Sequence, residues 1–343
     1  MNEQLQAMLS ESYGLNLQPS ANNLAFFFTA KNKLSRLRDE QDKEYVLKEI
    51  PRCYFDLSSP ENYFQGLNYF MAHLHERGLP LVEYLPTILG KIFIEATIEA
   101  TENIYVLMPF EEGTLYSNDI EEVRQVALLH GKINLALEEL TEDKIQFITK
   151  HNHNHFLRQG VPLVNLYEKV KVRLDALDRT AATELLEEVL PLVKANLDVL
   201  PDETYNHLPK QVTHKDIFPG NVLFKGEEKR PFLLDPDEFL YLPRIRDVAY
   251  AIWGFSTRKP PQKGVFPPDL EKASAYLESY LQEGVLTAEE INLLPQVMVR
   301  IWVEDVLHYS LLSSFTDEDK PNVERKINHL KHALEAQNEF RFE

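Results

Sequence analysis

The chain has 343 residues, of which 44% are hydrophobic and 26% are charged, and this is long enough for two packed lobes. A formal net charge of −18 argues against binding to nucleic acid or to an anionic membrane surface. No apolar run approaches the length of about 18 residues that a bilayer-spanning helix needs, and the first residues lack the apolar core of a secretory signal. The single cysteine, Cys53, excludes a disulfide framework. The sequence therefore predicts a cytoplasmic protein.

Apolar periodicity in the first part of the chain predicts strands, a helix and a hairpin. Residues 24–29 and 44–49 are rich in apolar β-formers and predict two strands. Apolar residues recur at helical spacing over 60–77, between a proline and a glycine, which predicts a helix. Alternating apolar residues at 92–98 and 104–108, on either side of a polar turn, predict a hairpin.

Most of the chain from residue 119 onward is predicted to be helical, because apolar residues recur at helical spacing in several segments. These segments include 163–177, 185–197, 268–283, 287–313 and 322–337. Together with the strands, they predict an α+β fold with a small β-rich N-terminal lobe and a large, mainly helical C-terminal lobe.

Between these helices lies a stretch that reads as strand, polar loop, strand, turn and strand. Its polar residues are His214, Asp216 and Asn221 on the loop and Asp235 and Asp237 after the last strand. If the hairpin folds near its polar turn, Asn221 and Asp235 face each other with Cβ atoms roughly 5 Å apart. Such oxygen ligands suit Mg²⁺, with Asp237 as a further candidate, while Asp216 would take a proton from a hydroxyl and His214 would fix the loop. The alternative is that these residues are ordinary solvated turn residues.

The spacing His-x-Asp-x(4)-Asn, followed by an aspartate after an apolar strand, is that of a phosphotransferase catalytic loop. On these residues the chain resembles the aminoglycoside phosphotransferase and choline kinase superfamily, which has a protein-kinase-like fold, and it is nearest to the homoserine-kinase-like and spore-coat-kinase-like branches. His214-Lys-Asp-Ile-Phe-Pro-Gly-Asn221 is similar to the catalytic loop of that family, Leu234-Asp-Pro-Asp-Glu238 to its metal-binding motif, and Arg246-Asp-Val-Ala249 to the segment that buttresses the site. The resemblance implies a nucleotide-binding lobe at residues 1–110, a catalytic and substrate-binding lobe at residues 111–343, a cleft between them, and ATP and Mg²⁺ as cofactors.

The resemblance also implies which residues of the N-terminal lobe hold the nucleotide. Lys48, in an apolar strand, would act as a point charge on the phosphates, although a lysine in a strand is otherwise an exposed residue. Glu61 would be its helix partner, but no carboxylate occupies the middle of that helix, and the alternatives are Gln65 or no residue at all. Met108 and Phe110, where the last strand ends, would contact adenine, or else belong to a plain loop. No glycine-rich phosphate loop is present, since a Pro-Ser-Ala-Asn-Asn segment stands in its place.

For the acceptor, the C-terminal lobe offers aromatic and acidic side chains. Trp253 and Trp302 would form an aromatic wall for an amine, or else pack in the core. Glu304 and Asp305 would bind the amine, or else form a solvated stripe on their helix. We therefore expect an ATP-dependent phosphotransferase that acts on a hydroxyl of a small, amine-bearing molecule of homoserine, aminoglycoside or choline type. The alternatives are a pseudokinase that binds nucleotide without turnover and a protein kinase, although the short path after Asp237 leaves no room for an activation segment.

Overall fold

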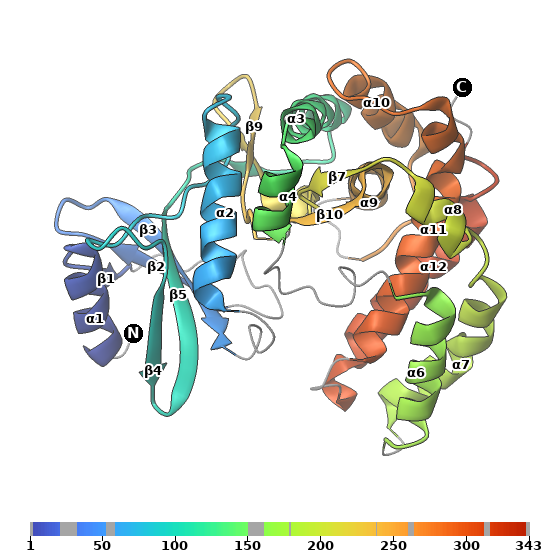
Figure 1. Cartoon of the computed structure of the whole chain (residues 1–343), viewed down its shortest axis with the longest axis horizontal. Coiled ribbons are helices and arrows are strands. Elements are labelled where there is room, and N and C mark those ends of the chain that lie inside the picture. The colour runs from blue at the N-terminus through green and yellow to red at the C-terminus, as the bar shows by residue number, and fades with distance from the viewer. Residues whose placement is uncertain are drawn as a thin grey trace. The chain divides into compact units, whose positions relative to one another are not determined.

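The computed structural model describes residues 3–20, 33–52, 59–149, 161–177, 180–237, 239–259, 264–311 and 316–340 (Figure 1). The strand expected at residues 24–29, most of the segment expected at the phosphates and Glu238 lie outside these ranges. The chain packs as two compact units. Unit 1 comprises Met1–Gly113, Gln146–His153 and Phe232–Asp237, and unit 2 comprises Thr114–Ile145, Asn154–Pro231 and Glu238–Glu343.

Unit 1 is built on a five-stranded antiparallel sheet in the order β1-β2-β3-β5-β4. Its strands are β1 (Gln18–Pro19), β2 (Lys33–Arg38), β3 (Glu44–Pro51), β4 (Ile94–Ile98) and β5 (Thr101–Pro109). The strand and the hairpin that the alternating pattern predicts are confirmed in β3 and in the β4–β5 pair. Lys48 lies opposite Leu34 on one side and Val106 on the other, in the middle strand of the sheet.

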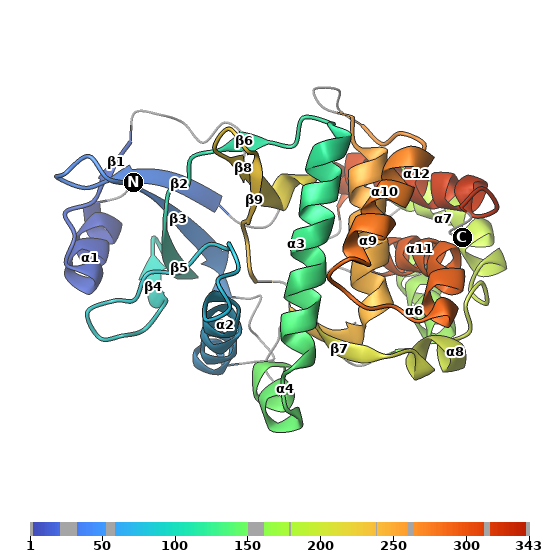
Figure 2. The same cartoon turned by 90° about the horizontal axis from the view of Figure 1, so that it is seen from above.

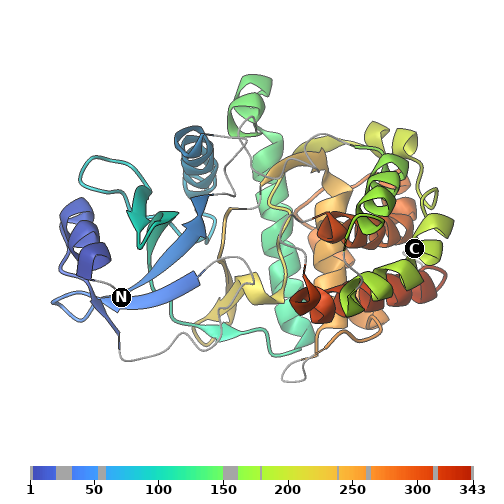
Figure 3. The same cartoon turned by 90° about the horizontal axis from the view of Figure 1, so that it is seen from below.

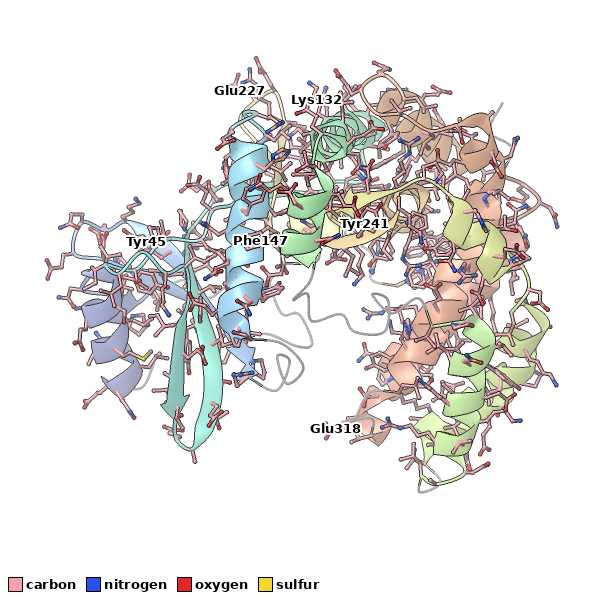
Figure 4. The ribbon with its side chains drawn as sticks, in the orientation of Figure 1. Tyr45, Lys132, Phe147, Glu227, Tyr241 and Glu318 are labelled. Atoms are coloured by element: carbon pink, nitrogen blue, oxygen red, sulfur yellow. The ribbon has the colours of Figure 1, made fainter. Side chains whose placement is uncertain are left out.

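The sequence pattern does not predict α1 (Glu3–Tyr13), which precedes the sheet in unit 1. The helix buries Leu5, Leu9 and Tyr13 in an apolar cluster with residues of the sheet, among them Tyr45, which is labelled in Figure 4. The buried side chains recur only once per turn, so the apolar stripe is narrow and the helical signal is weak.

Helix α2 (Pro60–His75) forms where the spacing of apolar residues predicts it. Pro60 occupies its first turn, where a missing backbone N–H needs no partner. The helix buries an aromatic-rich face that includes Tyr63, Phe64 and Phe70.

The chain that follows α2 is tied to β9 (Arg230–Leu233), the last strand before the two aspartates. The N–H of Val82 donates to the carbonyl oxygen of Leu233 (2.9 Å), and the N–H of Leu233 donates to that of Pro80 (2.9 Å). These two bonds fix the position in unit 1 from which the acidic segment continues.

Unit 2 is mainly helical, and the helices predicted from apolar spacing are confirmed with slightly shifted ends. Its helices include α3 (Ile120–Glu138), α6 (Leu163–Leu174), α7 (Ala181–Ala195), α8 (Asp202–His207), α9 (Arg244–Thr257), α10 (Leu270–Tyr280), α11 (Ala288–Ser310) and α12 (Lys320–Ala336), while α4 (Glu142–Thr149) runs from unit 2 into unit 1. Figure 2 shows α3 alongside α10, and Figure 3 shows α6 and α7 beside the longer α11 and α12. None of the described helices is both long and apolar enough to cross a bilayer.

Short strands frame the loop motif, as the sequence predicts. β7 (Lys210–Thr213) pairs with β10 (Leu240–Pro243), and β6 (Thr114–Leu115), β8 (Val222–Lys225) and β9 follow one another in a three-stranded sheet. The chain passes from unit 2 to unit 1 within β9.

A buried polar cluster joins α3, α9 and α10. The imidazole of His130 hydrogen-bonds through Nδ1 to the hydroxyl of Tyr276 (2.9 Å) and through Nε2 to Oδ2 of Asp247 (3.0 Å). The side-chain amide of Asn134 donates to the hydroxyl of Tyr280 (3.1 Å). Asp247 belongs to the predicted buttressing segment, and these bonds hold α9 against two other helices.

Gly131 on α3 allows that helix to approach the end of α10 closely. A Cβ atom at this position would lie 2.7 Å from the carbonyl oxygen of Tyr280 and 2.8 Å from the backbone nitrogen of Gly284. Gly131→Ala should therefore force the helices apart and lower the free energy of unfolding by about 1–3 kcal/mol, as measured by urea denaturation. Lys132→Ala is the control, because that side chain is 51% exposed on the same helix (Figure 4), and an equal loss of stability in both variants would contradict the steric explanation.

Candidate active site

The polar loop of unit 2 begins directly after β7. Its start is fixed where Thr213 donates from Oγ1 to the carbonyl oxygen of Leu240 on β10 (3.4 Å). His214 is buried, and its Nδ1 accepts the backbone N–H of Asp216 (3.3 Å). Lys215 between them has φ of 68°, a left-handed conformation that turns the backbone sharply. The imidazole therefore supports the turn from inside unit 2.

The carboxylate of Asp216 remains partly exposed, and its partners include Asn221 and Tyr250. The side-chain amide of Asn221 donates to Oδ2 of Asp216 (2.8 Å) and to its backbone oxygen (3.0 Å). The hydroxyl of Tyr250 on α9 hydrogen-bonds to the same carboxylate, and burial together with the charge of Asp216 raises the pKa of Tyr250 well above its usual value. The sequence does not single out Tyr250, whose only signal is its place about one turn after Asp247.

In unit 1, Lys48 contacts both aspartates that follow β9. Its Nζ lies 2.6 Å from Oδ1 of Asp235 and 2.6 Å from Oδ2 of Asp237, and only 3% of the residue is exposed. Burial alone would lower the pKa of Lys48, but the charges of Asp235 and Asp237 outweigh it and raise the pKa, so the amine is positively charged. The hydroxyls of Tyr63 and Tyr84 also contact Asp237, and no sequence pattern predicts either contact.

Glu61 does not pair with Lys48, and this expectation is wrong. Its Oε2 lies 2.7 Å from Nζ of Lys91, and its Oε1 accepts a hydrogen bond from the side-chain amide of Gln65 (3.3 Å). The Glu61 side chain is 41% exposed and pairs with the exposed Lys91, whereas Lys48 is buried in the sheet. The carboxylate partners of Lys48 come from the segment after β9 instead.

The two adenine candidates lie at the end of β5. Met108 is opposite Val46 in the sheet, and the backbone N–H of Phe110 donates to the carbonyl oxygen of Glu44 (3.0 Å). The guanidinium of Arg36 lies 3.7 Å from the centre of the Phe110 ring. The Phe110 N–H is thus used within unit 1, and adenine binding at Met108 and Phe110 stays a prediction.

The oxygen atoms that suit a divalent cation belong to different units. Asp235, in unit 1, has a left-handed φ of 46° and a side chain that is 23% exposed. Asn221, in unit 2, donates to Asp216 through its amide nitrogen, which leaves the amide oxygen as the ligand atom. Across the described ranges, no three or more His, Cys, Asp or Glu side chains cluster as metal ligands, and the metal-binding role of Asn221, Asp235 and Asp237 stays a prediction.

The two tryptophans belong to an aromatic cluster of unit 2 that joins α9, α11 and α12. The ring of Trp302 stacks on His329 with centroids 4.0 Å apart and planes within 8°. The indole of Trp253, only 1% exposed, donates to Nδ1 of His329 (2.8 Å) and therefore packs in the core. Tyr250, the partner of Asp216, lies next to Trp302 with ring centroids 6.2 Å apart.

The two neighbouring acids on α11 have different environments. Glu304 is buried, and its oxygens accept from Arg246 (2.5 Å) and Arg300 (2.9 Å), so its charge is used within the fold. The side chain of Asp305 is 39% exposed and pairs with Lys326. Burial would raise the pKa of Asp305, but the effects of Lys326, His308 and His329 together outweigh it and lower the pKa, so the carboxylate is ionised. Asp305, and not Glu304, therefore remains a candidate for contact with a ligand.

Comparison with known proteins agrees with this geometry. A family described as "Phosphotransferase enzyme family" matches residues 29–280. A homoserine kinase of Beijerinckia indica subsp. indica is 29% identical over 243 residues, which are 68% of this chain and 63% of that protein, less than two thirds of its length.

Solved structures with a similar fold are small-molecule kinases. Spectinomycin phosphotransferase APH(9)-Ia, in complex with ADP and spectinomycin, has a TM-score of 0.65 at 16% identity and covers 99% of both chains. Amicoumacin kinase hAmiN, in complex with AMP-PNP, Ca²⁺ and amicoumacin, has a TM-score of 0.64 at 13% identity, covering 100% of this chain and 96% of that one. Choline kinase LicA from Streptococcus pneumoniae has a TM-score of 0.52 at 15% identity, covering 98% and 97%. The predicted α+β, kinase-like fold and the family resemblance are confirmed.

The aromatic cluster predicts a pH dependence of stability. Burial and the nearby charge of Arg258 lower the pKa of His329 to about 3, and its Nδ1 accepts a hydrogen bond, so the folded protein holds this imidazole neutral. A histidine in the unfolded chain has a pKa of about 6.5, so below that pH the unfolded state binds one proton that the folded state does not. The free energy of unfolding therefore rises with pH in this range. Between about pH 6.5 and 5, His329→Gln should remove up to ~1.4 kcal/mol per pH unit from the slope of the unfolding free energy.

Urea denaturation of both proteins at several pH values measures this slope. Stacking is lost in the variant at every pH, so the comparison is of slopes rather than of absolute stability. Identical slopes in the two proteins would show that His329 is not held neutral.

Proposed function

The chain belongs to the phosphotransferase enzyme family, and we propose that it moves the γ-phosphoryl group of ATP to a hydroxyl of a small, amine-bearing molecule. The observation that carries the proposal is the partly exposed carboxylate of Asp216, which Asn221 and Tyr250 orient. In this proposal unit 1 binds the nucleotide and unit 2 binds the acceptor. Two relatives of the same fold were solved with AMP-PNP and with ADP, which supports ATP as the donor.

In the proposed reaction, Asp216 accepts the proton of the acceptor hydroxyl. The acceptor oxygen forms a bond to the γ-phosphorus while the bond from that phosphorus to the bridging oxygen of ADP breaks, and the products are ADP and the phosphorylated acceptor. Lys48 offsets negative charge on the phosphates. Asn221 and Asp235 are the residues that would hold Mg²⁺, which supplies positive charge at the phosphate oxygens when bound.

An acceptor with an amine is supported by Asp305 and by the aromatic side chains near it. Asp305 offers an ionised, partly exposed carboxylate on α11, one turn from Trp302, and Trp302 lies next to Tyr250. The relative at 29% identity is a homoserine kinase, and structural relatives are named for choline and spectinomycin. An ionised carboxylate beside an aromatic ring suits an ammonium group.

A panel of acceptors with ATP and Mg²⁺ tests this function, with ADP release and the phosphorylated product as readouts. The panel should contain homoserine, choline, ethanolamine, aminoglycosides, neutral sugars and a protein substrate. We expect turnover of an amine-bearing alcohol. Turnover of the protein or of a neutral sugar alone would contradict the proposal, and nucleotide binding without turnover of any acceptor would favour a pseudokinase.

Asp216→Asn should lower kcat by about 10²–10⁴ on the acceptor that the panel identifies, because the amide cannot take the hydroxyl proton. Nucleotide affinity, measured by calorimetry, should stay near that of the wild type. Asp198→Asn, at an exposed position of unit 2, is the matched control and should retain full activity. A kcat within threefold of wild type in Asp216→Asn would remove Asp216 from the reaction.

Asp305→Asn should raise the KM for the acceptor about 10-fold or more, since a charge-assisted hydrogen bond contributes about 1.5–3 kcal/mol. The KM for ATP should not change. Lys326→Met separates binding from structure, because it removes the ion pair but keeps the Asp305 carboxylate. If both variants raised the acceptor KM equally, the ion pair and not the carboxylate would be the cause.

A further inference from the structure

The buried Lys48 has no carboxylate partner from α2 among the described residues. The acid at the start of that helix, Glu61, forms an ion pair with Lys91 at the surface. Both carboxylate partners of Lys48 follow β9. The two partners differ in their surroundings, and this difference separates their roles.

Asp237 is held at three of its oxygen atoms. Its Oδ2 lies 2.6 Å from Nζ of Lys48, its Oδ1 accepts from the hydroxyl of Tyr84, and its backbone oxygen accepts from the hydroxyl of Tyr63 (2.7 Å). The four residues are between 1% and 6% exposed. Burial and the charge of Asp237 raise the pKa of Tyr84 well above its usual value, so its hydroxyl keeps its proton and donates.

The elements that carry the two tyrosines are fixed independently of Lys48. Tyr63 lies on the buried face of α2. Tyr84 follows the segment that pairs with Leu233, so the backbone that delivers the phenol is bonded to the strand that delivers Asp237. Helix α2 is thus linked to Lys48 indirectly, because its Tyr63 bonds to the backbone of Asp237 and the Asp237 carboxylate contacts Lys48.

Asp235 is the more accessible acid. Its side chain is 23% exposed against 9% for Asp237, and its left-handed φ of 46° marks a backbone conformation that is unusual outside glycine. A cation can reach the more accessible carboxylate of Asp235, whereas the carboxylate of Asp237 cannot turn without leaving the buried phenol of Tyr84 unpaired.

We propose that Asp237 is the positioning residue of Lys48, in the place that a helix carboxylate would otherwise take, and that Tyr63 and Tyr84 hold it there. Asp235 is then the acid of this pair that serves the metal, and Asp237 is not a metal ligand. This inference rests on the proposed nucleotide-binding function of unit 1. It predicts that loss of Asp237 acts on nucleotide phosphates through Lys48, with or without a cation.

Calorimetric titration tests the role of Asp237, with Mg·ATP in one series and with ADP plus EDTA in the other. Asp237→Asn should weaken binding by about 10- to 100-fold in both series, because a misplaced ammonium loses its contact with phosphate whether or not metal is present. Asp235→Asn should weaken Mg·ATP binding while changing ADP–EDTA binding less than threefold. Glu61→Gln should change either affinity less than twofold.

A double-mutant cycle separates positioning from a direct role. In a Lys48→Met background, Asp237→Asn should cost less than a further threefold, since the group that it positions is already gone. Tyr84→Phe removes one hydroxyl that holds Asp237, and it should weaken nucleotide binding a few-fold in the wild-type background and not at all in the Lys48→Met background. If circular dichroism shows that Asp237→Asn does not fold, this variant tests the positioning role in its place.

Three outcomes would overturn the inference. A defect of Asp237→Asn that is confined to the Mg·ATP series would make Asp237 a metal ligand, and full additivity with Lys48→Met would give it a separate role. A wild-type protein that binds neither nucleotide would overturn the proposed function and this inference together, whereas the first two outcomes leave the proposed function intact.

Discussion

Burying the ammonium group of Lys48 costs several kcal/mol unless carboxylates lie against it, and unit 1 is arranged around that requirement. β3 holds Lys48 in the middle of the sheet, and the chain returns 187 and 189 residues later to bring Asp235 and Asp237 against it. The pairing of Leu233 with the chain after α2 fixes where the segment that carries these two aspartates begins. Because a slip of one residue in such a pairing sends every side chain to the opposite face, this short backbone contact contributes to the neutralisation of the buried amine.

Carboxylates in unit 2 are held in two different ways. Glu304 and Glu290 on α11 are buried and paired with Arg246 (2.5 Å) and Arg244 (3.0 Å) on α9, so their charges are neutralised and the two helices are joined. The partners of Asp216 include an amide and a phenol. Such donors orient a carboxylate, and in the proposed reaction Asp216 accepts a proton. Glu304 and Glu290 therefore join the helices of unit 2, whereas Asp216 is the acid proposed for catalysis.

How far the sequence predicts the site depends on how far apart the partners lie along the chain. The contact between Asn221 and Asp216 spans five residues, so the loop motif is enough to place both in one site. Lys48 and Asp237 are 189 residues apart, and no local pattern joins them, which is why helix position alone suggests Glu61. The same limit applies to the fold. Helices with a wide apolar face follow from periodicity, whereas α1, with one buried side chain per turn, does not.

A fold shared at 13% to 16% identity with kinases named for amicoumacin, spectinomycin and choline leaves acceptor choice to a few side chains. In this chain the side chains proposed to bind the acceptor are packed against a partner of Asp216, the proposed base. Tyr250 hydrogen-bonds to Asp216 on one side and packs beside Trp302 on the other, and Trp302 is stacked on His329. If the aromatic surface binds the acceptor, as proposed, a change in it therefore also moves a hydrogen-bond partner of Asp216, the proposed base. Selection for a new acceptor and retention of the catalytic rate would then act on the same packed rings, so substitutions near Trp302 should alter both together.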